Sequence, residues 1–328
     1  MPLLLNMLCQ SPVRAGHTAV EAVNETVDLA RAAERLGYHR FWVAEHHSDP
    51  GLASASPEIL IARIASVTER LRVGAGGVLL PHYSAFKVAE QFQLLCALFG
   101  DRIDLGLGRA GGTEREAVAA LRSELTQRGA PFRHADELLA WLQGSDPRWP
   151  RTFASPPGPG PQPWMLGTSP ASAKYAADHG LPYAFGGFID PRQAETALAT
   201  YHRHFRPSTF CPKPHVNLGW YVLAAETDVE ARHRARSAEH WFVQSMLRGR
   251  AEPFQRPDDV VDAVYAPHEQ MAIEMRRAGS IIGAADSVAE RLADLAKRWM
   301  VDELTLVTIT WDHAHRIASY EALAERLL

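Results

Sequence analysis

The feature that most constrains the fold is a regular alternation of short apolar runs with segments of helical periodicity. A strand that is followed by a helix and then another strand usually pairs in parallel, because the crossover needs a dozen or more residues. Up to residue 110 the predicted strands are 3–8, 40–44, 71–75 and 103–107, and the predicted helices are 17–36, 57–70 and 84–99. The first part of the chain is therefore predicted to form a parallel sheet covered by helices.

The alternation continues to the C-terminus, so residues 1–328 are predicted to form one domain. The further strands are 164–166, 183–185, 216–225 and 304–309, and the further helices are 113–128, 135–142, 171–179, 191–204, 228–246 and 312–327. Eight strands that alternate with helices favour a single (β/α)8 TIM barrel, an α/β fold, over two Rossmann halves.

Two segments interrupt the alternation. Residues 155–163 are rich in proline and glycine, which is typical of a domain boundary, but the strand pattern resumes directly after them. We therefore interpret this segment as an extended connector. Residues from about 249 to 283 show only a short helical pattern, at 267–277, and are predicted to be an insertion before the eighth strand.

Composition excludes several classes of function. The net charge is −4, and no run of Lys or Arg is long enough to form a basic arm, so we expect no binding to nucleic acid or to anionic membranes. The three cysteines, Cys9, Cys96 and Cys211, fit no disulfide or metal-ligand spacing, which indicates a reducing compartment. The N-terminus lacks the features of a signal peptide, and no apolar run is long enough to cross a membrane. A cytoplasmic protein is expected.

The end of the second predicted strand carries the first candidate site. The apolar run from Phe41 to Ala44 is followed directly by Glu45, His46 and His47. A single histidine there would more often be a surface or core residue, but three adjacent titratable groups after a buried strand favour a functional site. The C-terminal ends of parallel strands are where such barrels keep their chemistry.

Glycine-rich turns follow several other strands. They are Gly76-Gly77, Gly108-Arg109-Ala110-Gly111-Gly112, Gly167-Thr168-Ser169 and Gly186-Gly187. Bare backbone N–H groups, hydroxyl groups before a helix and an arginine together suit a phosphate group. Each turn alone is equally consistent with a tight strand-to-helix turn and a helix cap. The dinucleotide fingerprint is absent, because Gly74-Ala75-Gly76 lacks the third glycine and runs into another apolar segment.

Longer motifs resemble the bacterial luciferase-like flavin-dependent monooxygenases over most of the chain. The matching stretches are 41–47 (FWVAEHH), 73–81 (VGAGGVLLP), 83–91 (YSAFKVAEQ), 101–109 (DRIDLGLGR), 166–169 (LGTS), 180–185 (GLPYAF) and 302–304 (DEL). The resemblance implies the same barrel with an insertion before the last strand. It also implies flavin mononucleotide (FMN), bound at the C-terminal rim of the barrel.

The resemblance assigns a role to each candidate residue. His46 would be the acid/base group beside the flavin ring, and Gly76-Gly77 would form a non-proline cis peptide beneath it. Arg109 would bind the flavin phosphate with Thr168, Ser169 and Ser172, while Gly108 and Gly167 would line the cofactor site. The luciferase large subunit has cysteine where Gly108 stands, and glycine there fits a non-luminescent oxygenase.

The implied reaction uses reduced FMN and O2, through a flavin hydroperoxide, to oxygenate a small organic substrate. Such a site must exclude water, and the aromatic candidates for its wall are Trp42, Phe185, Phe188, Trp220 and Trp311. Since the sequence has no nicotinamide-binding motif, a separate flavin reductase is expected to supply the reduced flavin. The organic substrate is not indicated, because variable loops and the insertion contact it.

Two other interpretations remain open, and an oligomeric state is expected. One alternative is a deazaflavin-dependent dehydrogenase or reductase of the same superfamily. The other is a non-catalytic flavin-binding protein or an inactive partner subunit, which the retention of His46 and Arg109 disfavours. Luciferase-like barrels commonly pair through their early helices, and the predicted helix 57–70 is apolar around much of its circumference, so a homodimer is expected.

Overall fold

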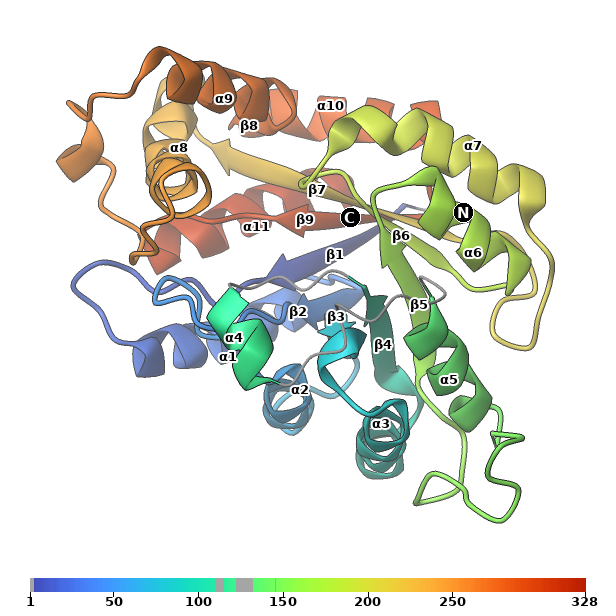
Figure 1. Cartoon of the computed structure of the whole chain (residues 1–328). Helices are drawn as coiled ribbons and strands as arrows, with labels where there is room; N and C mark the ends of the chain where they lie inside the picture. The colour runs from blue at the N-terminus through green and yellow to red at the C-terminus, as the bar shows by residue number, and fades with distance from the viewer. Residues whose placement is uncertain (1–2, 110–114, 122–131, 145) are drawn as a thin grey trace.

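The computed structural model describes residues 3–109, 115–121, 132–144 and 146–328. Eight parallel strands form its centre: β1 (Leu4–Cys9), β2 (Arg40–Val43), β3 (Arg72–Leu79), β4 (Ile103–Gly108), β5 (Gln162–Gly167), β6 (Tyr183–Gly186), β7 (Val216–Ala225) and β9 (Glu303–Val307). Consecutive strands pair from β1 to β7, and β9 pairs with both β7 and β1, so the sheet closes on itself. The predicted (β/α)8 barrel is confirmed (Figure 1).

The structure contains one further strand that the sequence analysis missed. β8 (Ile281–Ala284) pairs in parallel with the last four residues of β7, Val222–Ala225. Those residues lie past the stretch of β7 that pairs with β9, which ends at Tyr221. Since β8 has only four residues and its sequence, Ile-Ile-Gly-Ala, does not alternate, its periodicity gives little signal.

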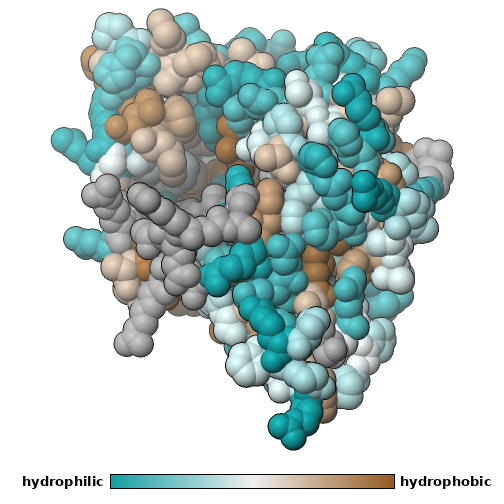
Figure 2. Space-filling model, turned by 45° about the vertical axis from the view of Figure 1, so that its right-hand side comes forward, coloured by the Kyte–Doolittle hydropathy of each residue, from teal (hydrophilic) through white to brown (hydrophobic). Residues whose placement is uncertain are grey.

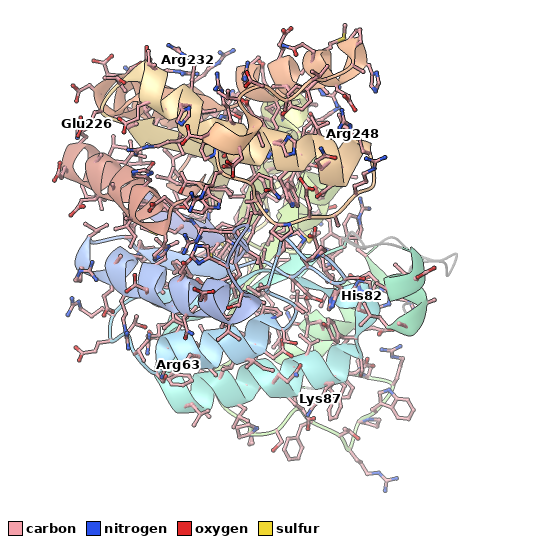
Figure 3. All side chains as sticks on the ribbon, turned by 90° about the vertical axis from the view of Figure 1, so that its left-hand side faces the viewer. Arg63, His82, Lys87, Glu226, Arg232 and Arg248 are labelled. Atoms are coloured by element: carbon pink, nitrogen blue, oxygen red, sulfur yellow. The ribbon has the colours of Figure 1, made fainter. Side chains whose placement is uncertain are left out.

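Helices surround the barrel, as Figure 1 shows. They are α1 (Ala19–Arg35), α2 (Pro57–Ala65), α3 (Ala85–Phe99), α4 (Arg115–Ala120), α5 (Arg133–Leu142), α6 (Pro170–Asp178), α7 (Ala194–His204), α8 (Asp228–Trp241), α9 (Pro267–Ala278), α10 (Ala285–Trp299) and α11 (His313–Leu327). Their apolar faces pack against the strands, while charged side chains such as Arg63 and Arg232 lie on the outer surface (Figure 3). No helix in the described ranges is both long and apolar enough to cross a membrane.

Two helices end earlier than periodicity predicts. α2 stops at Ala65 because the Glu34 carboxylate accepts the backbone N–H groups of Glu69, Arg70 and Leu71, at 2.7 to 3.0 Å, which draws these residues out of a helix. α8 ends at Trp241 and continues as a π-helical segment, Phe242–Leu247. The predicted helix 113–128 is seen as α4, and most of its remainder lies outside the described residues.

A buried ionic network fills the barrel interior at the end where the strands begin. Arg40 donates from Nε and Nη2 to the two carboxylate oxygens of Glu303, at 2.6 and 2.8 Å, and from Nη1 to Asp104 at 2.7 Å. Its guanidinium also lies over the Trp164 ring, 4.7 Å from the ring centre. Burial opposes ionisation of Glu303, but the Arg40 charge and the hydrogen bonds from His215 and Arg40 outweigh it, so the pKa of Glu303 lies well below its usual range. This network fills the barrel interior between the starts of β2, β4 and β9.

The predicted insertion holds α9 and β8 and lies between α8 and α10. Figure 1 shows α9 at the end of the molecule toward which the β7 arrow points. Phe254 from this segment is fully buried and stacks on Trp241 of α8, with ring centres 5.0 Å apart. The insertion is therefore packed onto the C-terminal end of the barrel, where the candidate site residues also gather.

Candidate active site

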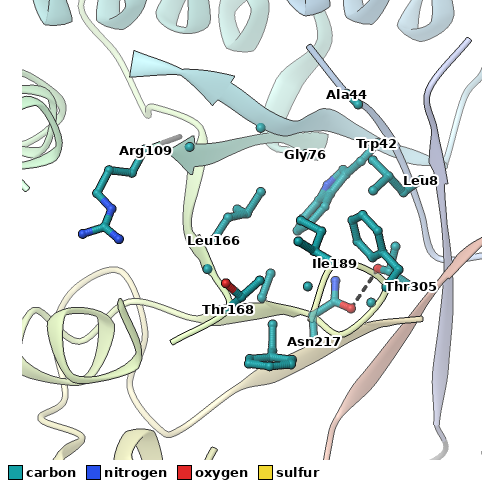
Figure 4. A pocket seen from close by; sticks show the side chains of 18 of the residues that line it. Leu8, Trp42, Ala44, Gly76, Arg109, Leu166, Thr168, Ile189, Asn217 and Thr305 are labelled. Carbon is teal, nitrogen blue, oxygen red and sulfur yellow. Dashed lines mark hydrogen bonds between the residues drawn. The ribbon is translucent and has the colours of Figure 1, made fainter. Parts of the chain in front are cut away.

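A cavity of about 410 Å³ opens at the C-terminal end of the strands. All nine predicted site residues line it: His46, Gly76, Gly77, Gly108, Arg109, Gly167, Thr168, Ser169 and Ser172. They come from β3, from the ends of β2, β4 and β5 and from the start of α6, which meet at one rim because the strands run in parallel (Figure 4). A volume of this size lies in the range of small-molecule sites, about 300–1,000 Å³.

The surface around this end of the molecule is uneven. The face shown in Figure 2 is mostly hydrophilic, with hydrophobic surface visible where it is hollowed. The cavity lining agrees with this picture, because most of the surface that the lining residues expose to the cavity is apolar. A ligand that enters would exchange water for an apolar wall, which strengthens every polar contact made inside.

His46 sits at the rim of the cavity, just after β2. Its backbone N–H donates to the Ser54 carbonyl at 2.8 Å, which fixes the main chain at the strand end. Burial, and to a smaller extent the neighbouring His47, lowers the pKa of His46 to about 4. The imidazole is therefore neutral near pH 7 and can accept a proton from a bound molecule.

Glu45 links the ends of β2 and β3 beside His46. Its buried carboxylate accepts the Leu79 backbone N–H at 2.8 Å and the Tyr83 hydroxyl at 2.8 Å, and His47 Nε2 lies 2.7 Å from it. Burial, helped by the Glu45 charge, raises the pKa of Tyr83, so the phenol stays protonated and donates. Glu45 thus fixes the ends of β2 and β3 relative to each other, and His47 points to Glu45 rather than lining the cavity.

The peptide bond between Gly76 and Gly77 is cis, as the family resemblance implied. A Cβ atom on Gly76 would lie 2.9 Å from Leu8 Cδ1, and one on Gly77 would lie 2.6 Å from the Gly106 carbonyl oxygen. Side chains at these positions would clash with neighbouring strands, so the backbone itself forms this part of the cavity wall. A flat ring system can approach a wall of this kind closely.

Arg109 marks the other end of the cavity. It is exposed, it follows β4, and its guanidinium lies over the Phe132 ring, 5.1 Å from the ring centre. Figure 4 shows its side chain extending away from the cavity-lining side chains of Trp42 and Leu8. A Cβ on the preceding Gly108 would lie 2.7 Å from the Val78 carbonyl oxygen, so glycine is required for the strand contact there.

The start of α6 lines the same cavity as Arg109. Ser169 caps this helix and accepts the Ser172 backbone N–H at 3.4 Å. The buried Ser172 hydroxyl donates to the Ser169 carbonyl at 2.8 Å and lies 3.1 Å from the Tyr183 hydroxyl, so it is already engaged. A Cβ on Gly167 would collide with it at 2.1 Å. Ser172 therefore shapes this wall, which leaves the Thr168 hydroxyl and the positive helix end to face an anion.

The predicted aromatic wall is present in part. Trp42, Phe185 and Phe188 line the cavity, whereas Trp220 packs against Trp299 and Trp311 lies under Arg256. Several strand residues that were not predicted also line the cavity, among them Leu8, Leu166, Ala184, Asn217, Gly219 and Thr305. They occupy inward positions in β1, β5, β6, β7 and β9, and the two-residue period of those strands was the signal that could have found them.

Comparison with known proteins decides the family. Residues 4–303 match the family described as luciferase-like monooxygenase. This chain belongs to that family. A relative from Bacillus subtilis (strain 168), N-acetyl-S-alkylcysteine monooxygenase, is 33% identical over 99% of this chain and 98% of its own length. The crystal structure of apo-MsnO8 shares 38% identity with a TM-score of 0.90 and covers 99% of both chains.

The barrel fold is also found in solved structures with low sequence identity to this chain. An F420-dependent secondary alcohol dehydrogenase in complex with an F420-acetone adduct has the same fold, with a TM-score of 0.70 over 100% of both chains, at 13% identity. At that identity the likeness concerns the fold alone. Membership of the luciferase-like family supports a flavin-type monooxygenase, and the choice of cofactor depends on the site.

Proposed function

We propose that this protein is an FMN-dependent monooxygenase that uses reduced FMN and O2 to oxygenate a small organic substrate. The observation that supports it most is the joint placement of a neutral His46 and of Arg109 around one largely apolar cavity. An acid/base group at the ring, a cation at the phosphate and a dry interior between them are the requirements of flavin-dependent oxygenation.

The residues present fit a flavin nucleotide. The glycine backbone at 76–77 leaves a wall that any Cβ would fill, which suits the face of an aromatic ring. Arg109 and Thr168, with the N-terminal end of α6, would hold the phosphate, while Ser169 and Ser172 set the position of that helix end. Leu8, Trp42 and Leu166 would surround the ring with apolar side chains.

When bound, the reduced flavin supplies the electrons that activate O2. The residues of the chain exclude water and handle the proton. The apolar wall excludes water from the ring, and the neutral His46 imidazole can take up or return a proton at its edge. Glu45 keeps His46 in place by holding the strand ends, so it is a positioning residue.

We further propose a two-component system, with reduced FMN supplied by a separate reductase, and a homodimer as the working assembly. For the substrate we propose a thioether of the N-acetyl-S-alkylcysteine class, because a relative that matches 99% of this chain carries that name. The insertion with α9 lies on the same end of the barrel and is placed to contact the substrate.

Stopped-flow spectroscopy of the protein with reduced FMN and O2 tests the proposal. Oxidation of the bound flavin through a transient distinct from free FMN is the expected result. A deazaflavin-dependent dehydrogenase would instead bind F420 and transfer hydride without consuming O2. A non-catalytic flavin-binding protein would bind oxidised FMN and leave the rate of flavin oxidation unchanged.

A further inference from the structure

The cavity wall holds a buried donor, the side-chain amide of Asn217, to which the proposed reaction gives no role. Within the described part of the chain, several buried side-chain polar atoms lack a hydrogen-bond partner, and only Asn217 Nδ2 belongs to a residue that lines the cavity. Asn217 is fully buried, in the stretch of β7 that pairs with β6 and β9. A buried amide donor without an acceptor destabilises the folded state, so its presence needs an explanation.

A chain of hydrogen bonds fixes which end of the Asn217 amide is free. Asn6 Nδ2 donates to the Glu303 carboxylate at 2.7 Å and more weakly to the Thr305 hydroxyl at 3.4 Å. The Thr305 hydroxyl in turn donates to Asn217 Oδ1 at 2.8 Å, as the dashed line in Figure 4 shows. If the amide were turned over, the Thr305 proton would lose its acceptor. The network that starts at Glu303 therefore leaves the Asn217 N–H groups as the unused donors.

The surroundings of this donor are otherwise apolar or already satisfied. Trp42 donates its indole N–H to Asp104 at 3.1 Å, and the Thr305 hydroxyl is committed to Asn217. Leu8, Leu166 and Ala184 complete this part of the lining. A ligand atom that can accept a hydrogen bond and that reaches this part of the cavity meets Asn217 as its available side-chain donor.

We infer that Asn217 Nδ2 donates a hydrogen bond to an oxygen acceptor of the molecule that fills the cavity. The inference rests on the proposed function. The acceptor is either a ring carbonyl of the flavin or an oxygen of the organic substrate, since both kinds of molecule carry such groups. Asn217 is then a specificity residue. It disfavours ligands that place only apolar atoms beside its side chain, because such ligands leave the buried amide N–H without a hydrogen-bond acceptor.

A double variant separates a binding role from a structural one. Asn217→Leu with Thr305→Val removes both partners of the internal bond and the unmet donor. Replacing both members of a buried pair by apolar groups is often neutral or stabilising. The double variant is therefore expected to melt at the same temperature as the parent apoprotein or higher, and yet to bind FMN or the substrate about tenfold more weakly.

The matched control is Tyr38→Phe. Tyr38 is buried, donates to the Tyr320 carbonyl at 2.8 Å and does not line the cavity. The Tyr38→Phe variant should be less stable than the parent and should bind FMN and the substrate with the same affinity as the parent. Fluorescence titration with oxidised FMN, melting curves and the infrared carbonyl bands of bound FMN are measured for all three proteins, followed by KM for N-acetyl-S-benzylcysteine.

Weaker FMN binding with shifted carbonyl bands identifies the flavin as the partner, and unchanged FMN binding with a raised KM identifies the substrate. If affinity, carbonyl bands and KM all match the parent, Asn217 holds at most a water molecule and the inference is wrong. Should the parent protein bind F420 instead of FMN, the proposed function fails, and the same titration with F420, whose ring also carries carbonyls, decides the inference separately.

Discussion

The Glu45 carboxylate accepts the backbone N–H of Leu79 at 2.8 Å, which joins the end of β2 to the end of β3. His46, which follows Glu45, and Gly77, two residues before Leu79, both line the cavity. The geometry of the proposed acid/base group therefore depends on a buried charge that does not itself need to touch the ligand.

Glu45→Ala is expected to destabilise the protein by about 2–4 kcal/mol. It would leave the Leu79 N–H and the Tyr83 hydroxyl, both donors to Glu45, without an acceptor in a buried place. Urea denaturation measures the loss. Glu45→Gln keeps one oxygen acceptor and should lose less than half as much, so equal losses in the two variants would contradict the positioning role.

Arg109→Ala is expected to weaken FMN binding by about 1.5–3 kcal/mol, the usual contribution of a charge-assisted hydrogen bond. Arg109 is exposed and makes only a ring contact with Phe132 among the interactions that the structure describes, so folding should be unaffected. Quenching of flavin fluorescence gives the dissociation constant. Arg232→Ala, an exposed change on α8 (Figure 3), is the control and should leave affinity unaltered. Equal affinities would remove Arg109 from the phosphate site.

The Glu303 network predicts a specific acid sensitivity. Its folded-state pKa is depressed below the value of about 4.3–4.5 in the unfolded chain, so its contribution is fully present above that pH and is lost as the pH falls toward the folded pKa. Glu303→Gln should lower the free energy of unfolding at pH 7 by about 3–5 kcal/mol, because Arg40 loses one of its two buried carboxylate partners and keeps only Asp104. The variant should also show a shallower loss of stability below pH 4.5 than the parent.

The control for this experiment is Asp286→Asn, which removes the exposed partner of Arg326. A surface pair of that kind contributes about 0.2–1 kcal/mol. Urea denaturation between pH 3 and pH 7 gives the free energy of unfolding of each variant at pH 7 and its change with pH. Parallel pH profiles for the parent and Glu303→Gln would show that the network does not control acid stability.

The exposed apolar side chains of α2 and α3 support the proposed homodimer. Ile59 on α2 is 67% exposed, and Leu94 and Leu98 on α3 are 51% and 63% exposed. Glu58 and Gln91 link these two helices through a hydrogen bond of 3.3 Å, so their outer faces are continuous. Leu98→Asp should convert a dimer to monomer in sedimentation experiments at micromolar concentration, whereas Val229→Asp, at a 72% exposed position on α8, should not. A monomeric parent would rule out the dimer.

Sequence periodicity was sufficient for the barrel and for the rim of the cavity. The run from Phe41 to His47 and the turns that begin at Gly108, Gly167 and Gly186 lie at strand ends, and parallel pairing alone brings strand ends together. Gly76-Gly77 was predicted to follow a strand 71–75 but lies inside β3, which continues to Leu79. The floor of the cavity was missed because Asn217 and Thr305 lie inside largely apolar strands, and only the two-residue period of β7 and β9 indicates that their side chains point inward. Their importance depends on closure of the barrel between β7 and β9, which brings together residues 88 positions apart in the chain.

The functional proposal depends most on His46. With a pKa of about 4, its imidazole is neutral at the working pH and lines the cavity. His46→Ala should bind FMN almost normally and lose oxygenation by about 10²–10⁴-fold, the usual contribution of an acid/base group, while reduced flavin is consumed and released as hydrogen peroxide. The measurement is product formed per reduced flavin consumed, with N-acetyl-S-benzylcysteine as substrate. His47→Ala is the matched control, because His47 contacts Glu45 and does not line the cavity, and its yield should fall far less. If His46→Ala forms as much product per reduced flavin consumed as the parent does, the histidine is structural. The chain is then a flavin-binding barrel whose chemistry depends on other residues.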